Sequence, residues 1–274
     1  MKFSIITTSF NPGEKLMFTI KSILDQDFRD FEIVVKDGAS KDRTPEKLQQ
    51  DKRAGQAIAE QKLKLIIKED RNVYDGMNQA LEVCQGEYIL FLNCGDRFHD
   101  RKVLAKAAEE IDKRNNAMGN VPAIYYGNTY CMRTDSMVHS APEITGFTCY
   151  RNIPCHQSCF YDRRLFQEKK YDTSLKIRAD YDHFLWCFYQ VKARFQYLDI
   201  VVSDYEGGGI SEMKENRNAD KAEHELVIKR YMKMSEILKY KGIMLLTLAP
   251  LRRWIAESSS LSGIYHFVKN FLYH

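Results

Sequence analysis

The chain has 274 residues, of which 44% are hydrophobic and 28% are charged, as is typical of a globular protein with an ample core. The seven cysteines follow no short disulfide pattern, and no apolar stretch reaches the roughly 18 residues that span a bilayer, so we expect a reduced, cytoplasmic protein without a signal peptide. The net charge is only +4, and the basic excess lies after residue 228, where eight Lys or Arg side chains stand against two Glu.

Strands and helices alternate along the first hundred residues. Apolar runs predict strands at 3–9, 31–37, 63–68 and 87–93. Apolar residues at helical spacing predict helices at 14–25, 73–84 and 100–114, and Thr44-Pro45 marks the start of another. This order predicts a mainly parallel sheet with right-handed crossovers.

The pattern changes after residue 120. We expect two strands within 123–139 around a turn at Thr134-Asp135, then a short helix at 180–190 and a strand at 195–205. Gly207-Gly208-Gly209 follows this strand, and residues 213–240 have a charged helical pattern.

Carboxylates stand where predicted strands end and where one helix begins. Asp37 and Asp42 follow the second strand, Asp96 follows the fourth, and Asp180 opens the helix at 180–190. Ligands of open α/β sheets bind at strand ends, and carboxylate oxygens there suit a divalent cation that binds phosphates.

Four segments, in this order, resemble family-2 glycosyltransferases with the GT-A fold. They are the first strand FSIITTSFN, DGASKDRT, RNVYDGMNQALEVCQGEYILFLNCGD and the later ADYD. The resemblance covers about residues 1–212 and is similar to bacterial enzymes of polysaccharide and O-antigen assembly. It implies a Rossmann-like α/β domain at 1–212, with a nucleotide-binding half at 1–115 and an acceptor half at 116–212. A helical extension would occupy 213–274.

The resemblance also implies an activity. Such enzymes transfer a sugar with inversion from a nucleotide-sugar, most often a UDP-sugar, to a hydroxyl of a glycan or a lipid-linked acceptor. Asp37 matches the aspartate that binds the base or ribose, and Thr8 and Ser9 match the strand end that lines the nucleotide. Asp70 and Asn78 match polar positions around the third strand and its following helix.

Two further carboxylates match the metal ligand and the catalytic base of the family. Asp96 is the aspartate that remains of the metal-binding motif, which falls on 93–96 and begins with Asn93, and it would hold Mn or Mg. Asp180 matches the general base, preceded by Ala179 where the family has glutamate. A carboxylate near the acceptor hydroxyl can take its proton, and a cation stabilises the leaving diphosphate.

Each carboxylate also has a purely structural interpretation. Asp37 could form a turn, Asp42 could be a loop residue, and Asp96 could cap the helix near residue 100. Asp180 could be an N-cap, which is compatible with catalysis, and Asp182 is the alternative base.

The segment from Cys155 to Cys159 allows a zinc site, but its spacing favours buried thiols. His156 is expected to face the acceptor or the diphosphate, as similar histidines do in relatives. The Gly207-Gly208-Gly209 segment has two equally supported interpretations, a flexible loop or a lid over the diphosphate.

The tail combines basic residues with Trp254, Tyr265, Phe267, Phe271 and Tyr273, which suits a helix lying on an anionic membrane. Packing on the catalytic domain or in a homo-oligomer is the alternative, and no nucleic-acid motif is present.

For the whole chain, the alternatives to a glycosyltransferase are a nucleotidyltransferase and a degenerate nucleotide-binding or membrane-binding module. Ala179 and the incomplete metal motif support the degenerate module.

Overall fold

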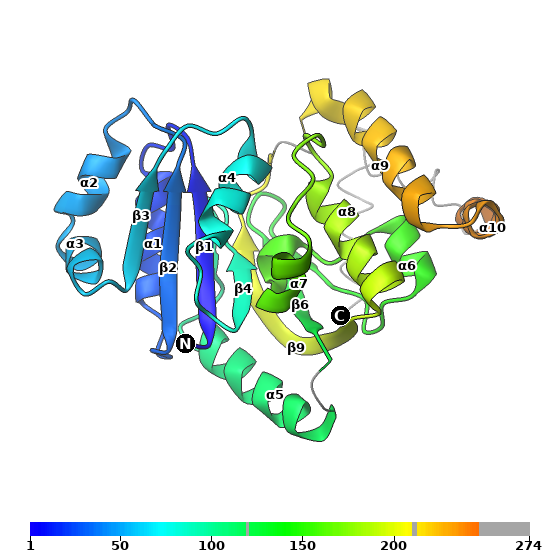
Figure 1. The fold of residues 1–274 in the computed structure, drawn as a ribbon, viewed down its shortest axis with the longest axis horizontal. Helices are drawn as coiled ribbons and strands as arrows, with labels where there is room; N and C mark the ends of the chain where they lie inside the picture. The colour runs from blue at the N-terminus through cyan, green and yellow to red at the C-terminus, as the bar shows by residue number, and fades with distance from the viewer. Residues whose placement is uncertain (119–120, 210–212, 247–274) are drawn as a thin grey trace. The chain divides into compact units, whose positions relative to one another are not determined.

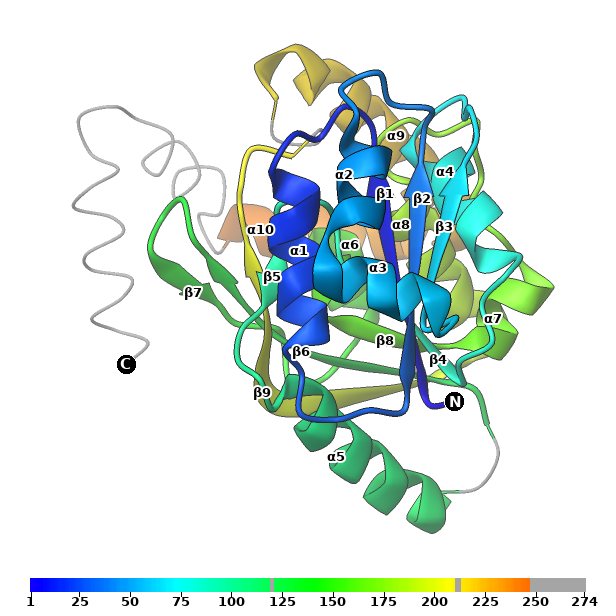
Figure 2. The same cartoon turned by 90° about the vertical axis from the view of Figure 1, so that its left-hand side faces the viewer.

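The computed structural model describes residues 1–118, 121–209 and 213–246. The chain forms two compact units, Met1–Val227 and a second that begins at Ile228. Within the first unit the described residues form one mixed sheet, with helices on both of its faces (Figures 1 and 2).

The first four large strands form the parallel part of the sheet in the order β3-β2-β1-β4. They are β1 (Phe3–Ser9), β2 (Phe31–Asp37), β3 (Leu63–Ile67) and β4 (Tyr88–Phe91), as predicted within three residues at each end. Register places Ser9 beside Asp37, and Asp37 beside Ile67. The strand order reverses between β1 and β4, which is where ligands bind in such sheets.

The sheet continues as β4-β8-β6-β9-β5, in which β8 is antiparallel to both neighbours and β6 is parallel to β9. These strands are β5 (Arg97–Phe98), β6 (Ala123–Cys131), β8 (Cys159–Asp162) and β9 (Arg194–Tyr205), and β7 (Ser136–Val138) pairs with β6. The predicted hairpin at 123–139 is thus confirmed, with Asp135 at φ 47° in its turn. The sequence did not predict β5 and β8.

Helices cover the two faces of the parallel strands. Side chains of α1 (Lys15–Leu24), α3 (Lys52–Ala59) and α5 (Val103–Met118) share one buried cluster with β1, β2 and β4. Helix α4 (Val73–Leu81) packs on the opposite face, against β1 and β2. The helix predicted from Thr44 is divided into α2 (Thr44–Gln50) and α3, because Asp51 takes an extended conformation and caps α3.

Shorter helices occur between β7 and β9, before and after β8. They are α6 (Gly146–Arg151), a 3₁₀ turn at His156–Ser158, α7 (Arg163–Glu168) and α8 (Ala179–Trp186), which continues as a π-helical turn at Cys187–Val191. After residue 213 come a 3₁₀ turn at Lys214–Asn216, α9 (Arg217–Tyr231) and α10 (Met234–Leu246). No helix in the described ranges is long and apolar enough to cross a bilayer. The predicted domain boundary at residue 212 stays a prediction. The predictions for the tail after residue 246 lie outside the described residues.

Candidate active site

Asp37 ends β2 and is fully buried beside the end of β1. Its carboxylate accepts a hydrogen bond from Ser9 Oγ at 2.8 Å and two from Ser40, from the backbone N–H and from Oγ, both at 2.7 Å. Phe10, 69% exposed, lies next to Gly38, where an added Cβ would come within 3.2 Å of the phenyl ring. Asp37 therefore both fixes the turn that follows β2 and lies beside an exposed aromatic ring. Thr8, half-buried, precedes this group on β1.

Asp70 is held next to Asp37 by a buried lysine. The Nζ of Lys36 is fully buried and donates to Asp70 Oδ2 at 2.5 Å, to Lys68 O at 2.6 Å and to Asp37 O at 3.1 Å. A buried ammonium needs such partners, because its desolvation is costly. Lys36 therefore fixes the carboxylate of Asp70 at the strand ends, a role that the sequence did not reveal.

Asn78 and Asp42 hold loops. The Asn78 amide donates to Tyr171 O at 2.9 Å and accepts from Tyr171 N at 3.0 Å, which fastens that segment to α4. Asp42 accepts from Gly13 N at 2.8 Å and so joins the turn after β2 to the loop after β1. The structure thus groups Ser9, Asp37 and Asp70, while the Asn78 amide is committed to backbone groups.

Asp96 lies in the loop after β4, and this loop is attached to α1. Thr19 Oγ1 donates to Asp96 O at 2.7 Å and accepts from Gly95 N at 3.0 Å. Gly95 has φ +101°, a conformation that favours glycine. Helix α5 begins only at Val103, so Asp96 does not cap it.

The carboxylate of Asp96 is only 2% exposed. Oδ1 accepts from Glu206 N at 2.9 Å, whereas the buried Oδ2 has no hydrogen-bond partner among the described residues. Burial raises the pKa of Asp96 to about 7, since water no longer solvates its charge. A buried carboxylate oxygen without a donor fits a divalent cation, which would supply the missing positive charge.

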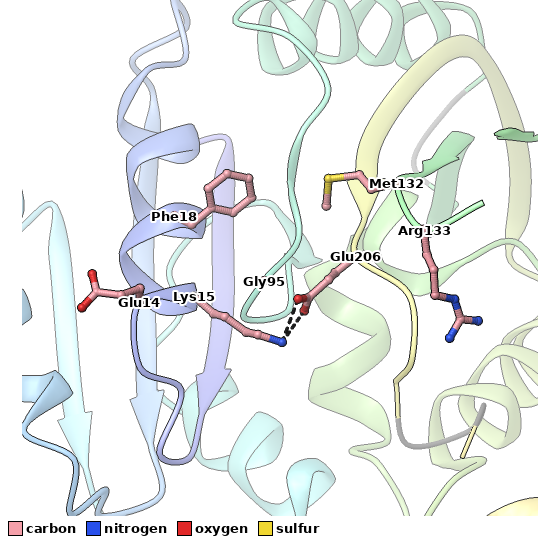
Figure 3. Close-up of a pocket in the computed structure, with 7 residues that line it drawn as sticks. All are labelled: Glu14, Lys15, Phe18, Gly95, Met132, Arg133 and Glu206. Atoms are coloured by element: carbon pink, nitrogen blue, oxygen red, sulfur yellow. Dashed lines mark hydrogen bonds and ion pairs between the residues drawn. The ribbon is translucent and has the colours of Figure 1, made fainter. Parts of the chain in front are cut away.

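A cavity of about 530 Å³ opens beside this loop. Figure 3 shows its lining, which comes from the start of α1, the loop after β4, the end of β6 and the end of β9: Glu14, Lys15, Phe18, Gly95, Met132, Arg133 and Glu206. Lys15 Nζ and Glu206 Oε1 form an ion pair at 2.7 Å (Figure 3). Glu206 was not predicted as a site residue, although it is a carboxylate directly after a predicted strand, the signal that identified Asp96.

Asp180 lies in the first turn of α8 and is 19% exposed. Oδ1 accepts from Tyr181 N at 2.8 Å and from Tyr74 OH at 3.1 Å, and Oδ2 lies 3.0 Å from His156 Nδ1. Burial by itself would raise the pKa of Asp180, but hydrogen bonds, first that of His156 and then those of Tyr181 and Tyr74, outweigh it and hold this pKa below its ordinary value. Asp180 is therefore an ionised carboxylate that is reachable from outside.

The structure disfavours two other interpretations: that Asp180 caps α8, which would be compatible with catalysis, and that Asp182 is the base. Arg178, not Asp180, occupies the N-cap position of α8. Asp182 is fully buried and forms an ion pair with Lys169 Nζ at 2.7 Å, so an acceptor cannot approach it.

The side chain of His156 lies between the two predicted catalytic regions. Its Nε2 is 2.8 Å from Asn93 Nδ2, in the same loop as Asp96, and its Nδ1 contacts Asp180. Cys155 and Cys159 are free thiols. No group of three or more His, Cys, Asp or Glu side chains in the described ranges is arranged to hold a metal ion.

Gly207 and Gly208 follow Glu206 with φ +87° and +79°, a backbone that favours glycine at both positions. Their part in binding a diphosphate stays a prediction.

Comparison with known proteins identifies the family. Residues 4–177 match the model of "Glycosyl transferase family 2". A "PGL/p-HBAD biosynthesis glycosyltransferase" of Mycobacterium bovis is 30% identical over 256 residues, which cover 92% of this chain and 90% of the relative. The "Putative teichuronic acid biosynthesis glycosyltransferase TuaG" of Bacillus subtilis is 32% identical over 114 residues, 42% of this chain and 43% of the relative.

Solved structures share the fold at lower identity. S. aureus TarS 1-349 superposes with a TM-score of 0.66 at 19% identity, covering 93% of this chain and 78% of that one. The mannosyltransferase PcManGT from Pyrobaculum calidifontis gives 0.65 at 17% identity, covering 100% and 81%. The predicted fold and enzyme class are thereby confirmed, and the chain belongs to glycosyl transferase family 2.

Proposed function

We propose that this glycosyltransferase moves a sugar, with inversion, from a UDP-sugar to a hydroxyl of a glycan or lipid-linked acceptor in the synthesis of a cell-surface polysaccharide. The observation that carries the proposal is the pairing of two unlike carboxylates. Asp96 is buried with an unpartnered oxygen and a raised pKa, while Asp180 has a lowered pKa. Such a difference separates a ligand for a cation from a general base.

The residues divide the reaction between them. Ser9, Asp37 and Asp70 would bind the nucleoside, with the exposed ring of Phe10 available for the base. Asp180 would take the proton of the acceptor hydroxyl as its oxygen attacks the anomeric carbon. Attack from the side opposite the diphosphate inverts the anomeric centre.

Asp96 would hold a divalent cation, Mn or Mg, with the remaining positions filled by diphosphate oxygens and water. Such a cation stabilises the charge of the leaving nucleoside diphosphate. Its presence is supported by the partnerless Oδ2 of Asp96 and by the relative PcManGT, whose structure is a complex with GDP-Man and Mn2+.

The choice of UDP rests on TarS, which has been solved with UDP-GlcNAc and with UDP. A donor screen tests it. Purified protein is mixed with UDP-, GDP- and dTDP-sugars and Mn or Mg, and release of nucleoside diphosphate is followed. Release from a UDP-sugar that Asp180→Asn abolishes and the exposed Asp199→Asn retains supports the proposal. Turnover of a nucleoside triphosphate to pyrophosphate would instead indicate a nucleotidyltransferase.

We also propose that the C-terminal extension binds an anionic membrane surface, which would place the reaction at the inner face of the cell membrane. Exposed apolar side chains of α10, namely Met234, Leu238, Leu245 and Leu246, accompany Lys239 and Lys241 in the same helix. Apolar and basic residues together favour the headgroup region.

A further inference from the structure

Three polar side chains from distant parts of the sequence form one chain of hydrogen-bond contacts. Asn93 follows β4, His156 begins the 3₁₀ turn before β8, and Asp180 is in the first turn of α8. Asn93 Nδ2 lies 2.8 Å from His156 Nε2, and His156 Nδ1 lies 3.0 Å from Asp180 Oδ2. Both nitrogens of the ring are therefore in hydrogen-bond contact, so each neighbour constrains where the ring carries its proton.

The two neighbours select one tautomer. An amide nitrogen can only donate, so His156 Nε2 must accept and carries no proton. An ionised carboxylate can only accept, so Nδ1 must carry the proton and donate it to Asp180. A free imidazole exchanges between two tautomers, whereas this environment satisfies only the neutral ring with Nδ1–H.

The same contacts indicate which carboxylate oxygen remains available. A carboxylate has about four acceptor positions, two on each oxygen. On Asp180, Oδ1 already accepts from Tyr181 N–H at 2.8 Å and from the hydroxyl of Tyr74 at 3.1 Å, while among the described residues Oδ2 contacts only His156. The position left for a substrate hydroxyl is on Oδ2, beside the imidazole ring.

We propose that His156 is a positioning residue, held by Asn93 as the neutral Nδ1–H tautomer, and that it presents Oδ2 of Asp180 as the base atom of the transfer. This inference rests on the proposed function, because it takes Asp180 as the base. It assigns to Asn93 and His156 a role in orienting the base, in addition to any contact with the donor.

The proton balance is simple. The acceptor O–H bond breaks and its proton moves to Asp180 Oδ2, while the oxygen forms the new bond to the anomeric carbon. The bond from that carbon to the diphosphate oxygen breaks, and its electron pair leaves with the nucleoside diphosphate. His156 keeps its Nδ1 proton throughout and holds the carboxylate in one orientation.

Asn93 is the residue that keeps the ring neutral. A carboxylate at this position would require a proton on Nε2, while Asp180 still requires one on Nδ1, so the ring would become an imidazolium. Among the described residues, Asp96 is a further acidic group that interacts electrostatically with His156. A full positive charge beside Asp180 would weaken it as a base.

Nitrogen NMR of the full chain labelled with ¹⁵N-histidine reads this arrangement without any substrate. We expect the His156 signals, assigned by their loss in His156→Asn, to show a protonated Nδ1 and a bare Nε2 at neutral pH. Asn93→Asp should protonate Nε2 as well, whereas Asn116→Asp, the same change at an exposed position of α5, should leave the ring unchanged. A protonated Nε2 in the unmodified chain, or a neutral ring in Asn93→Asp, overturns the inference.

Kinetics separate positioning from stability. His156→Leu should lower the rate of UDP release from the best UDP-sugar about 10²-fold, a larger loss than any that it causes in UDP affinity measured by calorimetry. His156→Asn, whose amide N–H can replace Nδ1–H, should release UDP at no less than about a tenth of the rate of the unmodified protein. Equal losses in the two folded variants would exclude an orienting hydrogen bond. Full turnover by Asp180→Asn would instead contradict the proposed function, and the NMR result would stand independently.

Discussion

Asp96 and Glu206 are joined by a hydrogen bond of 2.9 Å from the backbone N–H of Glu206 to Oδ1 of Asp96, although 110 positions separate them in the sequence. This bond joins the loop after β4 to the end of β9 and holds the Asp96 carboxylate in a buried position. The second oxygen is left buried without a donor. The charge on that oxygen is therefore uncompensated by any hydrogen bond among the described residues.

Removal of this carboxylate should abolish a metal effect on nucleotide binding. We predict that Mn or Mg tightens UDP binding about tenfold or more, which corresponds to roughly 1.4 kcal/mol, and that Asp96→Ala removes the gain. Calorimetry with added metal and with EDTA measures it, with Asp199→Asn as the control. Equal affinities in both conditions would mean that the enzyme works without a metal.

Asp96 should also lower the stability of the metal-free protein at neutral and higher pH. Its pKa is raised to about 7 in the folded state, above about 3.9 in the unfolded chain, so the folded state binds the proton more tightly. Its unfavourable contribution is absent below about pH 4, grows as pH rises to 7, and is then constant. In EDTA, Asp96→Asn should therefore raise the melting temperature at pH 8 and change it little near pH 4. A destabilised variant at pH 8 would contradict this account.

The ion pair between Lys15 and Glu206 should matter more for binding than for stability. Both side chains are about half exposed, and such pairs contribute about 0–1 kcal/mol. We predict that Lys15→Ala weakens UDP binding, because it removes a cation from the cavity beside Gly95, and that Glu206→Ala in EDTA strengthens it, because it frees Lys15. Titrations at low and high salt test this, since both effects should shrink as salt screens the charges. Effects of the same sign in the two variants would exclude direct electrostatics.

Asp180→Asn should remove transfer and retain donor binding. Loss of a general base costs about 10²–10⁴ in rate, while the nucleoside contacts at Asp37 are untouched. Asp182→Asn should act differently. It removes the buried partner of Lys169 and should lower stability by about 1–3 kcal/mol. Near-normal turnover by Asp180→Asn would exclude it as the base.

The parallel half of the fold follows from local sequence, and the antiparallel half does not. β1 and β2 have apolar centres, Ile5-Ile6 and Ile33-Val34-Val35, and are almost wholly buried, and their bounds were predicted to the residue. β8 has only four residues, and β5 has two. β4 is as short as β8 but was predicted from the apolar run at 87–93. No such run marks β5 or β8, which become strands by pairing with β4, β6 and β9. The antiparallel position of β8 between β4 and β6 is therefore a tertiary effect.

The candidate site shows the same division. Asp37, Asp96 and Asp180 could be found because each stands at the end of a predicted element or in a family motif. The contacts that set their chemistry could not, because they join segments far apart: Lys36 with Asp70, Asn93 with His156, and Asp96 with Glu206. Asn78 is the opposite case. It matches a family motif position, but its amide forms hydrogen bonds with the Tyr171 backbone.

The C-terminal extension gives the last prediction. Lys239 and Lys241 of α10, with Arg252 and Arg253 beyond it, could each contribute about 1 kcal/mol near an anionic surface, and Trp254 and the terminal aromatic residues would enter the headgroup region. We therefore expect the full chain to co-sediment with liposomes that contain anionic lipid at low salt, and a chain ending near residue 240 to stay in solution. Neutral liposomes serve as the control, and high salt should weaken binding because the attraction is largely electrostatic. If the full chain also stays in the supernatant with anionic lipid, the basic and aromatic residues serve packing or an oligomer contact, which sedimentation velocity of the two chains would then distinguish.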